Sequence, residues 1–349
     1  MSVFYPLKVK EVRRETPSSV SVLFEVPAEL ENEFRFKPGQ YVNIKKMLRE
    51  KELRRAYSIC SSIHGGEVRI AIKKVDGGSF SVYANEKLKA GDVLDVTAPE
   101  GRFILDPEVK ADKYVLFAAG SGITPILSML SSVLESENNC KVVLVYGNQS
   151  IEETMFLNNL ESLKKNYPDR FSVHYVFSRK LSEKNHFGRI SENLIKTIFK
   201  EENIDSSING IYICGPEGMI EQVNDYLLQH QFSEDQIHIE WFNVSEEKEA
   251  SQGEFKGVAK VTVVLDEEET IFEMRQEETI LSAALAHGVD APYSCQGGIC
   301  SSCLAKVTEG AVKMDNNRIL SAEELAEGFI LTCQAHPITP IVSIDYDDV

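Results

Sequence analysis

Four cysteines near the C-terminal end of the chain constrain its fold more than any other feature. They are Cys295, Cys300, Cys303 and Cys333, in the spacing C-x4-C-x2-C followed by one distant cysteine. This spacing is typical of [2Fe–2S] sites, in which four thiolates must converge on two irons. Gly297 and Gly298 let the loop curl and let backbone N–H groups approach the sulfurs. Zinc is the next alternative, although zinc sites usually pair short spacings, and inert buried cysteines would not require this arrangement.

The other three cysteines, Cys60, Cys140 and Cys214, bring the total to seven. An odd number in a long chain, with no basic region and apolar core at its start, argues against a disulfide framework and a signal peptide. We therefore expect a cytoplasmic protein in which Cys60 and Cys140 are structural. No stretch approaches the roughly 18 apolar residues of a membrane helix, so no membrane association is expected.

Charge is distributed unevenly along the chain. The net charge is −17, yet residues 1–100 carry +3 and residues 258–349 carry −11. So acidic a chain is a poor candidate for nucleic acid, whose phosphates would repel it. A basic front and an acidic back indicate separate modules that dock with each other or with a partner.

Hydrophobic periodicity divides the chain into three modules and a linker. Residues 1–108 alternate short β-branched or aromatic runs with turn residues, which predicts a small antiparallel β-barrel. In residues 109–243, strands alternate with helices, one of them over Ile151–Lys165, which predicts a parallel sheet covered on both faces. Residues 244–257 are polar and aperiodic, which is typical of a flexible linker. Residues 258–349 contain a hairpin, a short helix, the cysteine loop and a closing strand.

Two glycine-containing turns of the second module have the pattern of a nucleotide site. The run Gly120-Ser121-Gly122-Ile123-Thr124-Pro125 lies between an apolar strand and a helix, where backbone N–H groups and a helix N-terminus meet a pyrophosphate. The run Cys214-Gly215-Pro216-Glu217-Gly218-Met219 follows another strand, so it lies at the carboxyl edge of the sheet, where open α/β folds bind ligands. Taken alone, either run could be an ordinary tight turn.

Together these motifs resemble the ferredoxin–NADP reductase family, which pairs a flavin-binding barrel with an NAD(P)-binding α/β domain. The tetrapeptide Arg55-Ala56-Tyr57-Ser58 resembles the flavin strand of that family. The resemblance implies that Arg55 binds the FAD pyrophosphate, Tyr57 packs on the isoalloxazine and Ser58 lies near flavin N5. The remaining flavin residues that it implies are Ile72, Lys73, Gly78, Phe80 and Ser81.

The same resemblance implies a hydride-transfer site and a nucleotide site. The implied catalytic residues are Ser58, Cys214 and Glu240. The implied nucleotide residues are Gly120, Gly122, Thr124, Pro125, Cys214, Gly215, Pro216 and Met219. Phe242 would cover the flavin, although the plant reductases end there with Tyr, whereas this chain continues. Ser178 and Arg179 resemble a 2′-phosphate site and favour NADPH, with NADH and an ordinary basic surface loop as alternatives.

Residues 258–349 resemble a plant-type ferredoxin domain of the α+β, β-grasp class. The order of flavin barrel, NAD(P) domain and ferredoxin resembles reductase components of multicomponent oxygenases, in particular those serving ring-1,2-phenylacetyl-CoA epoxidation. The resemblance implies that electrons pass from NADPH through FAD and the cluster to an oxygenase or another one-electron acceptor protein. Alternatives are the reductase of another oxygenase or a desaturase, an NAD(P)H:flavin or quinone reductase, and a non-enzymatic redox sensor.

Overall fold

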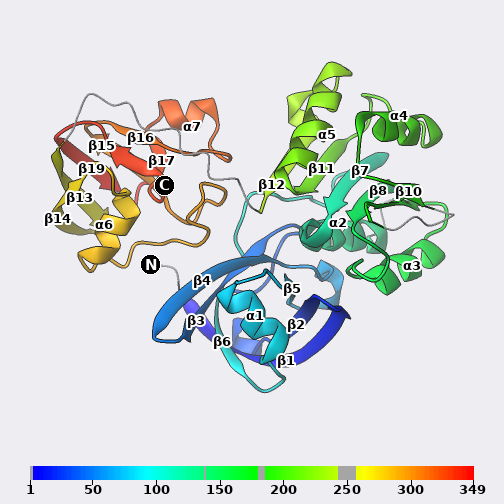
Figure 1. Cartoon of the computed structure of the whole chain (residues 1–349), viewed down its shortest axis with the longest axis horizontal. Helices are drawn as coiled ribbons and strands as arrows, with labels where there is room; N and C mark the ends of the chain where they lie inside the picture. The colour runs from blue at the N-terminus through cyan, green and yellow to red at the C-terminus, as the bar shows by residue number, and fades with distance from the viewer. Residues whose placement is uncertain (1–2, 137–138, 180–184, 243–256) are drawn as a thin grey trace. The chain divides into compact units, whose positions relative to one another are not determined.

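The computed structural model describes residues 3–136, 139–179, 185–242 and 257–349 (Figure 1). Residues 4–242 form one compact unit, and the C-terminal part of the chain forms a second. The predicted linker over residues 244–257 lies outside the described residues except for its last position. No helix of the described ranges is long and apolar enough to cross a membrane.

An antiparallel sheet of six strands forms the first module and curls into a barrel, as predicted. Its strand order is β4-β3-β6-β1-β2-β5, and its two ends meet where Ile59 bridges Ile70. Alternate side chains such as Val22 and Ile44 fill the interior, as the two-residue period of strands requires. The elements are β1 (Phe4–Thr16), β2 (Ser19–Glu25), β3 (Tyr41–Leu48), β4 (Lys51–Ser58), β5 (Arg69–Lys73), α1 (Ser79–Glu86) and β6 (Val93–Thr97).

The second module is a parallel sheet with helices on both faces, as predicted (Figure 1). Leu116 and Leu144 share a cluster with α2 and α3 on one face, whereas the Phe117 ring meets Phe199 of α4 on the other. The elements are β7 (Lys113–Ala119), α2 (Ile123–Glu135), β8 (Lys141–Asn148), α3 (Leu157–Asn166), β9 (Phe171–Phe177), β10 (His186–Phe187), α4 (Glu192–Glu201), β11 (Gly210–Gly215), α5 (Glu217–Gln229) and β12 (Ile237–Trp241).

The order of the parallel strands creates a switch point between β7 and β11. The order is β10-β9-β8-β7-β11-β12. From β7 the chain builds outward through β8, β9 and β10, and it then returns to place β11 on the other side of β7. Ligands of open α/β sheets bind in the crevice at such a reversal, outside the carboxyl ends of the strands.

One predicted helix is shorter than its sequence pattern indicated. Helix α3 begins at Leu157, not at Ile151. Phe156, which precedes it, has a left-handed backbone with φ of 59°, and the Phe156 side chain is buried in the core together with Met155. The amphipathic pattern was continuous across this point, but burial of these two side chains requires a turn that interrupts the helix.

Hydrogen bonds and shared packing join the barrel to the α/β module. The Ser128 hydroxyl of α2 donates to the Ser61 carbonyl at 2.7 Å, and the Ile63 N–H donates to the Ser132 hydroxyl at 3.2 Å. A Cβ atom added at Gly39 would lie 2.4 Å from the end of the Met129 side chain. Helix α2 is therefore anchored to the barrel along its length, and α2 starts at the predicted nucleotide loop.

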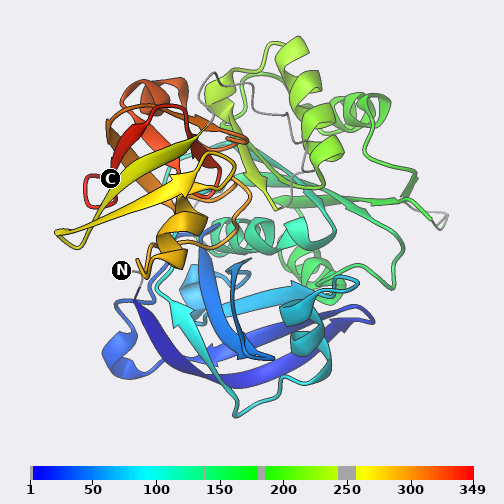
Figure 2. The same cartoon turned by 60° about the vertical axis from the view of Figure 1, so that its left-hand side comes forward.

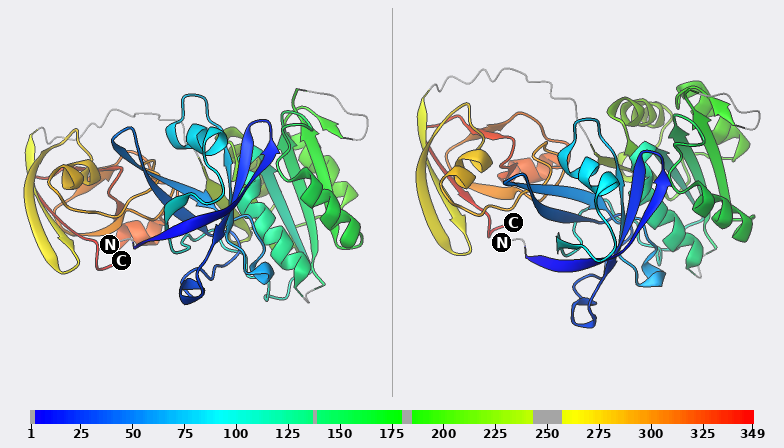
Figure 3. Two further views of the ribbon diagram at one scale, coloured as in Figure 1. Left: turned by 90° about the horizontal axis from the view of Figure 1, so that it is seen from below. Right: turned by 60° about the horizontal axis from the view of Figure 1, so that its bottom comes forward.

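The C-terminal unit contains a mixed five-stranded sheet and a small two-stranded one, and Figures 2 and 3 show its long β13–β14 hairpin with α6 alongside. The sheet order is β14-β13-β19-β15-β17, and its central strands β13 and β19 run parallel. Thr279 is the N-cap residue of helix α6, and its hydroxyl accepts a hydrogen bond from the Ser282 N–H. The elements are β13 (Val258–Leu265), β14 (Glu268–Arg275), α6 (Ile280–Ala286), β15 (Leu304–Glu309), β16 (Val312–Met314), α7 (Ala322–Ala326), β17 (Phe329–Leu331), β18 (Ala335–Pro337) and β19 (Ile341–Asp345).

Candidate redox and nucleotide sites

Two glycines bring the ends of β7 and β11 into close contact at the switch point. A Cβ atom added at Gly122 would lie 2.1 Å from the Cys214 carbonyl oxygen, and one added at Gly215 would lie 3.2 Å from the Ala119 nitrogen. A side chain is therefore excluded at Gly122, and one at Gly215 would force its neighbours to shift. The two predicted nucleotide motifs meet here across the strand ends, although they are far apart in the sequence.

Buried side chains support the turn between β7 and α2 from below. The Thr124 hydroxyl donates to the Ser121 carbonyl at 3.0 Å, and the Tyr146 hydroxyl donates to the Gly120 carbonyl at 3.1 Å. Thr124 and Pro125 are buried, whereas Gly120 and Ser121 are partly exposed. Thr124 therefore holds the shape of the turn, and the exposed part of the loop is the part that a ligand can reach.

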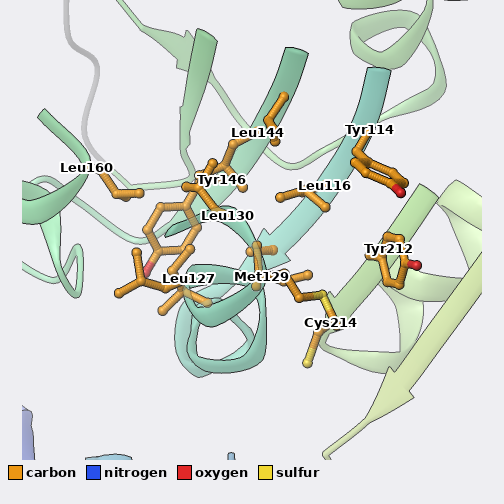
Figure 4. Packing of buried hydrophobic residues seen from close by; sticks show 14 of the residues in the cluster. Tyr114, Leu116, Leu127, Met129, Leu130, Leu144, Tyr146, Leu160, Tyr212 and Cys214 are labelled. Atoms are coloured by element: carbon orange, nitrogen blue, oxygen red, sulfur yellow. The ribbon is translucent and has the colours of Figure 1, made fainter. Parts of the chain in front are cut away.

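Cys214 and Glu240 lie side by side at the carboxyl ends of β11 and β12. They are paired in the parallel register. Complete burial, with the negative charge of Glu240 beside it, raises the pKa of the Cys214 thiol well above its usual range. The thiol is therefore neutral and protonated at physiological pH. Figure 4 shows Cys214 near Met129 at the edge of the cluster that also packs against Phe242.

The two predicted 2′-phosphate residues directly follow the end of β9. Ser178 and Arg179 are both exposed, and their N–H groups donate to the carbonyls of Asn148 and Gln149 at 3.0 Å. The backbone is thus fixed; the Ser178 hydroxyl donates to the Asn148 carbonyl at 3.4 Å, and Arg179 is exposed to solvent. Lys180, the next residue, lies outside the described residues.

In the barrel, the predicted flavin strand presents an aromatic side chain next to α1. The Tyr57 ring lies 5.7 Å from the Phe80 ring, and Phe80 lies 6.0 Å from Tyr83. Burial raises the pKa of Tyr57 well above its usual range, although the charge of Arg55 opposes this rise. Arg55 itself is exposed, and Ser58 at the end of β4 is buried. Arg55 and Tyr57 are two positions apart on β4, so their side chains lie on the same face of the strand.

The start of α1 is open at its N-terminus. Gly78 occupies the N-cap position and provides no side-chain acceptor for the first helical N–H groups. The Ser81 hydroxyl instead accepts from the Val75 N–H at 3.2 Å. Asn85 ties the helix to β5 by donating to the Ile72 carbonyl at 3.1 Å. An uncapped helix N-terminus held in this way is suited to an anion such as a phosphate.

Lys73 links the barrel to the nucleotide loop. Its ammonium nitrogen lies 3.7 Å from the position that a Cβ atom would take at Gly120. The positive charge of Lys73 is therefore beside the exposed part of the turn that follows β7. The resemblance implied a flavin role alone for Lys73, because nothing in the local pattern relates β5 to a loop so far along the chain.

In the C-terminal unit, the four cysteine sulfurs lie close together. The sulfurs of Cys295 and Cys300 are 3.1 Å apart, and hydrogen bonds link Cys333 to both Cys295 and Cys303. The Cys300 thiol donates to Cys295, and this bond, together with those from Cys333 and the Gly297 N–H, lowers the pKa of Cys295. Four sulfurs and inward N–H donors fit a [2Fe–2S] cluster, whose sulfurs are anionic.

Two amide side chains hold the cysteine loop from outside. Asn316 donates to the Gly297 carbonyl at 2.8 Å, and Gln334 donates to the Gln296 carbonyl at 2.9 Å. A Cβ atom at Gly298 would lie 2.6 Å from the Asn316 carbonyl oxygen, so this turn requires glycine. Neither amide was predicted from the sequence; the position of Gln334 directly after Cys333 was the available signal.

Comparisons with known proteins agree with this geometry. The chain matches the oxidoreductase FAD-binding domain over residues 6–104, the oxidoreductase NAD-binding domain over residues 116–225 and the 2Fe-2S iron-sulfur cluster binding domain over residues 263–337. The three predicted cofactor types, a flavin, a nicotinamide nucleotide and a [2Fe–2S] cluster, are thereby confirmed.

Relatives match over nearly the full length. A 1,2-phenylacetyl-CoA epoxidase subunit of Escherichia coli is 36% identical, with 99% of each chain covered. The ferredoxin reductase component of the 3-ketosteroid-9-alpha-monooxygenase of Rhodococcus rhodochrous is 31% identical over 97% of this chain and 96% of that one. The structure of phthalate dioxygenase reductase shares the fold, with a TM-score of 0.64, 21% identity and 98% coverage of both chains.

The relatives named above are components of oxygenase systems, and this chain contains an FAD-binding, an NAD-binding and a 2Fe-2S domain. It is therefore an oxidoreductase that belongs to the ferredoxin–NADP reductase family, in the branch that carries a C-terminal [2Fe–2S] ferredoxin domain.

Proposed function

We propose that this protein carries electrons from NADPH through FAD and its [2Fe–2S] cluster to the oxygenase component of a phenylacetyl-CoA epoxidase. The observation that carries the proposal is the 36% identity with the epoxidase subunit of Escherichia coli, which covers 99% of both chains. When bound, the flavin exchanges two electrons with the nicotinamide and single electrons with the cluster. The contribution of the chain is to bind and orient these groups.

The nicotinamide end of NADPH is assigned to the switch point between β7 and β11. Cys214 and Glu240 lie there in register. Gly122 approaches the Cys214 carbonyl closely and adds no side chain at the strand ends. The neutral Cys214 thiol places no negative charge where a hydride must pass. Glu240 is partly exposed and is the group that could exchange a proton at this edge.

The flavin is assigned to the barrel face that carries β4 and α1. The exposed Arg55 guanidinium would bind the pyrophosphate in a fork geometry. Tyr57 would pack on the isoalloxazine, since its ring is fixed against Phe80. The open N-terminus of α1 at Gly78 supplies further N–H donors for phosphate, and Ser58 at the end of β4 would lie toward flavin N5.

Lys73 is assigned to the pyrophosphate of NADPH and Arg179 to its 2′-phosphate. Lys73 lies beside Gly120, where its charge would attract the pyrophosphate. Ser178 and Arg179 extend from the end of β9, where a hydroxyl and a guanidinium would bind the 2′-phosphate by charge-assisted hydrogen bonds. No carboxylate stands at these two positions, as one would in a typical NADH site.

A second candidate acceptor is the oxygenase of another pathway. The 31% identity with the 3-ketosteroid-9-alpha-monooxygenase reductase component over 97% of this chain favours it. The two candidates share every cofactor and differ only in the protein that docks to receive electrons. The choice between them is therefore a question of partner surface.

Reconstitution with purified oxygenases tests the proposal. With NADPH, the holoprotein should support epoxidation of phenylacetyl-CoA by the phenylacetyl-CoA oxygenase at least tenfold faster than hydroxylation of a 3-ketosteroid by the 3-ketosteroid oxygenase. Each oxygenase is first shown to be active with its own reductase. Equal rates, or a preference for the steroid oxygenase, would contradict the assigned acceptor while leaving the reductase activity intact.

A further inference from the structure

The Ser294 hydroxyl is buried without a partner in the cysteine loop. Ser294 is 2% exposed, and its Oγ atom makes no hydrogen bond to the described residues. Thr332, which is equally buried in the same unit, differs: its hydroxyl donates to the Cys303 carbonyl at 3.0 Å and accepts from Tyr346 at 2.8 Å. An unpaired buried hydroxyl is destabilising, so it indicates a partner other than the chain itself.

Carbonyl groups next to Ser294 in the loop are already engaged. The Gln296 carbonyl accepts from Gln334 and the Gly297 carbonyl accepts from Asn316. These bonds hold the loop from its outer side. The acceptors that a bound cluster would add at this loop are anionic sulfurs, and the Cys295 sulfur follows Ser294 directly in the chain.

We propose that the Ser294 hydroxyl donates a hydrogen bond to an anionic sulfur of the bound [2Fe–2S] cluster and thereby raises its reduction potential. The proposal rests on the presence of the cluster, which the four sulfurs fit. A donor next to the cluster stabilises negative charge, and the reduced cluster carries one electron more than the oxidised cluster. The hydrogen bond is therefore stronger after reduction, and Ser294 is a positioning and tuning residue for electron transfer.

The Ser294→Ala variant of the full-length holoprotein tests this role. Its control is Ser301→Ala, because Ser301 belongs to the same loop but its side chain is only half-buried. Iron and acid-labile sulfide are measured first, then the midpoint potential of the cluster by redox titration followed by EPR. We expect Ser294→Ala to keep its cluster and to lower the equilibrium constant of reduction about tenfold, which is about 59 mV for a one-electron couple. Ser301→Ala should remain at the wild-type potential.

A full cluster in Ser294→Ala with the potential of Ser301→Ala would overturn the proposal. If Ser294→Ala loses iron, the pair Ser294→Thr and Ser294→Val decides, since the two side chains have one shape and only Thr carries a hydroxyl. The proposal is supported if Ser294→Thr keeps the cluster and Ser294→Val loses it. It is also supported if both keep the cluster and only Ser294→Val has a lowered potential. Equal behaviour of the pair, including loss of iron from both, contradicts it. Wild-type protein without iron and sulfide would instead refute the cluster assignment itself.

Discussion

The switch point of the α/β module and the cysteine loop of the C-terminal unit use different chemistry to build a site. At the switch point, glycines bring two backbones together, and a Cβ atom at Gly122 would lie 2.1 Å from the Cys214 carbonyl oxygen. In the cysteine loop, four thiols supply the donors, and amides from Asn316 and Gln334 hold the loop around them. A backbone site is sensitive to added atoms, whereas a side-chain site is sensitive to lost ones.

Removal of one thiol should have the largest effect and tests the side-chain half of this comparison. We expect Cys303→Ser to abolish the EPR signal of the reduced cluster, because Cys303 is buried beside Cys333 and a hydroxyl is a poor iron ligand. NADPH should still reduce the flavin at near wild-type rate, whereas cytochrome c reduction should fall at least tenfold. The matched control is Cys140→Ser, a buried thiol of the α/β module that should leave the cluster intact. Wild-type cytochrome c reduction without a cluster would show that electrons leave from the flavin directly.

Addition of one methyl group at the switch point tests the backbone half. We expect Gly122→Ala to slow flavin reduction by NADPH about 10- to 100-fold, because overpacking of this kind is destabilising by roughly 1–3 kcal/mol and displaces the strand ends from each other. Gly218→Ala is the control, since a Cβ atom there would meet nothing within 4 Å. The readout is stopped-flow absorbance of the flavin. Equal rates in both variants would mean that the close contact is not needed for hydride transfer.

Loss of an exposed charge should act only on cofactor choice. We expect Arg179→Ala to raise the KM for NADPH about 10- to 100-fold, since charge-assisted bonds contribute roughly 1.5–3 kcal/mol, and to leave the KM for NADH within about twofold. Arg179 is exposed and its N–H is bonded to the Gln149 carbonyl, so the backbone should not move. Steady-state kinetics with both nucleotides measures the ratio. An equal rise for NADH would show that the loop does not distinguish the 2′-phosphate.

The last prediction concerns Glu100, a partly buried carboxyl of the barrel and thus a side-chain feature within the first unit. Burial raises the pKa of Glu100 to about 7, although hydrogen bonds from Asn43 and Thr97 oppose the rise. The folded protein therefore binds this proton more tightly than the unfolded chain, and stability should fall as pH rises from about 4.3 to 7.

We expect Glu100→Gln to remove that dependence. The variant should unfold at a higher temperature than wild type at pH 8, by a free energy of up to about 3 kcal/mol, and at nearly the same temperature at pH 4. Exposed Glu108→Gln serves as the control and should follow wild type at both values. Thermal unfolding followed by circular dichroism is the measurement. A Gln variant that is less stable than wild type at pH 8 would contradict the raised pKa of Glu100.

The sequence by itself determined the class of each module and the kind of cofactor that each module binds. Cys295, Cys300 and Cys303 lie within one short loop, so their spacing alone indicates the metal. The turn from Gly120 to Pro125 is equally local, because a strand, a turn and a helix start are contained in a few consecutive residues. The roles assigned to Arg55, Glu240 and Arg179 stay predictions, since they came from resemblance rather than from local physics.

Only the tertiary structure decided which distant residues meet. Contact of Gly122 with Cys214, approach of Lys73 to Gly120 and the amide support from Asn316 all join segments that share no local pattern. The same holds for the shortened helix at Leu157, where burial of Phe156 overrides a continuous amphipathic period. Periodicity reports hydrogen bonds and side-chain directions within a few residues of each position. Contacts across the fold depend instead on strand order and on which surfaces are buried together, and one sequence window contains neither.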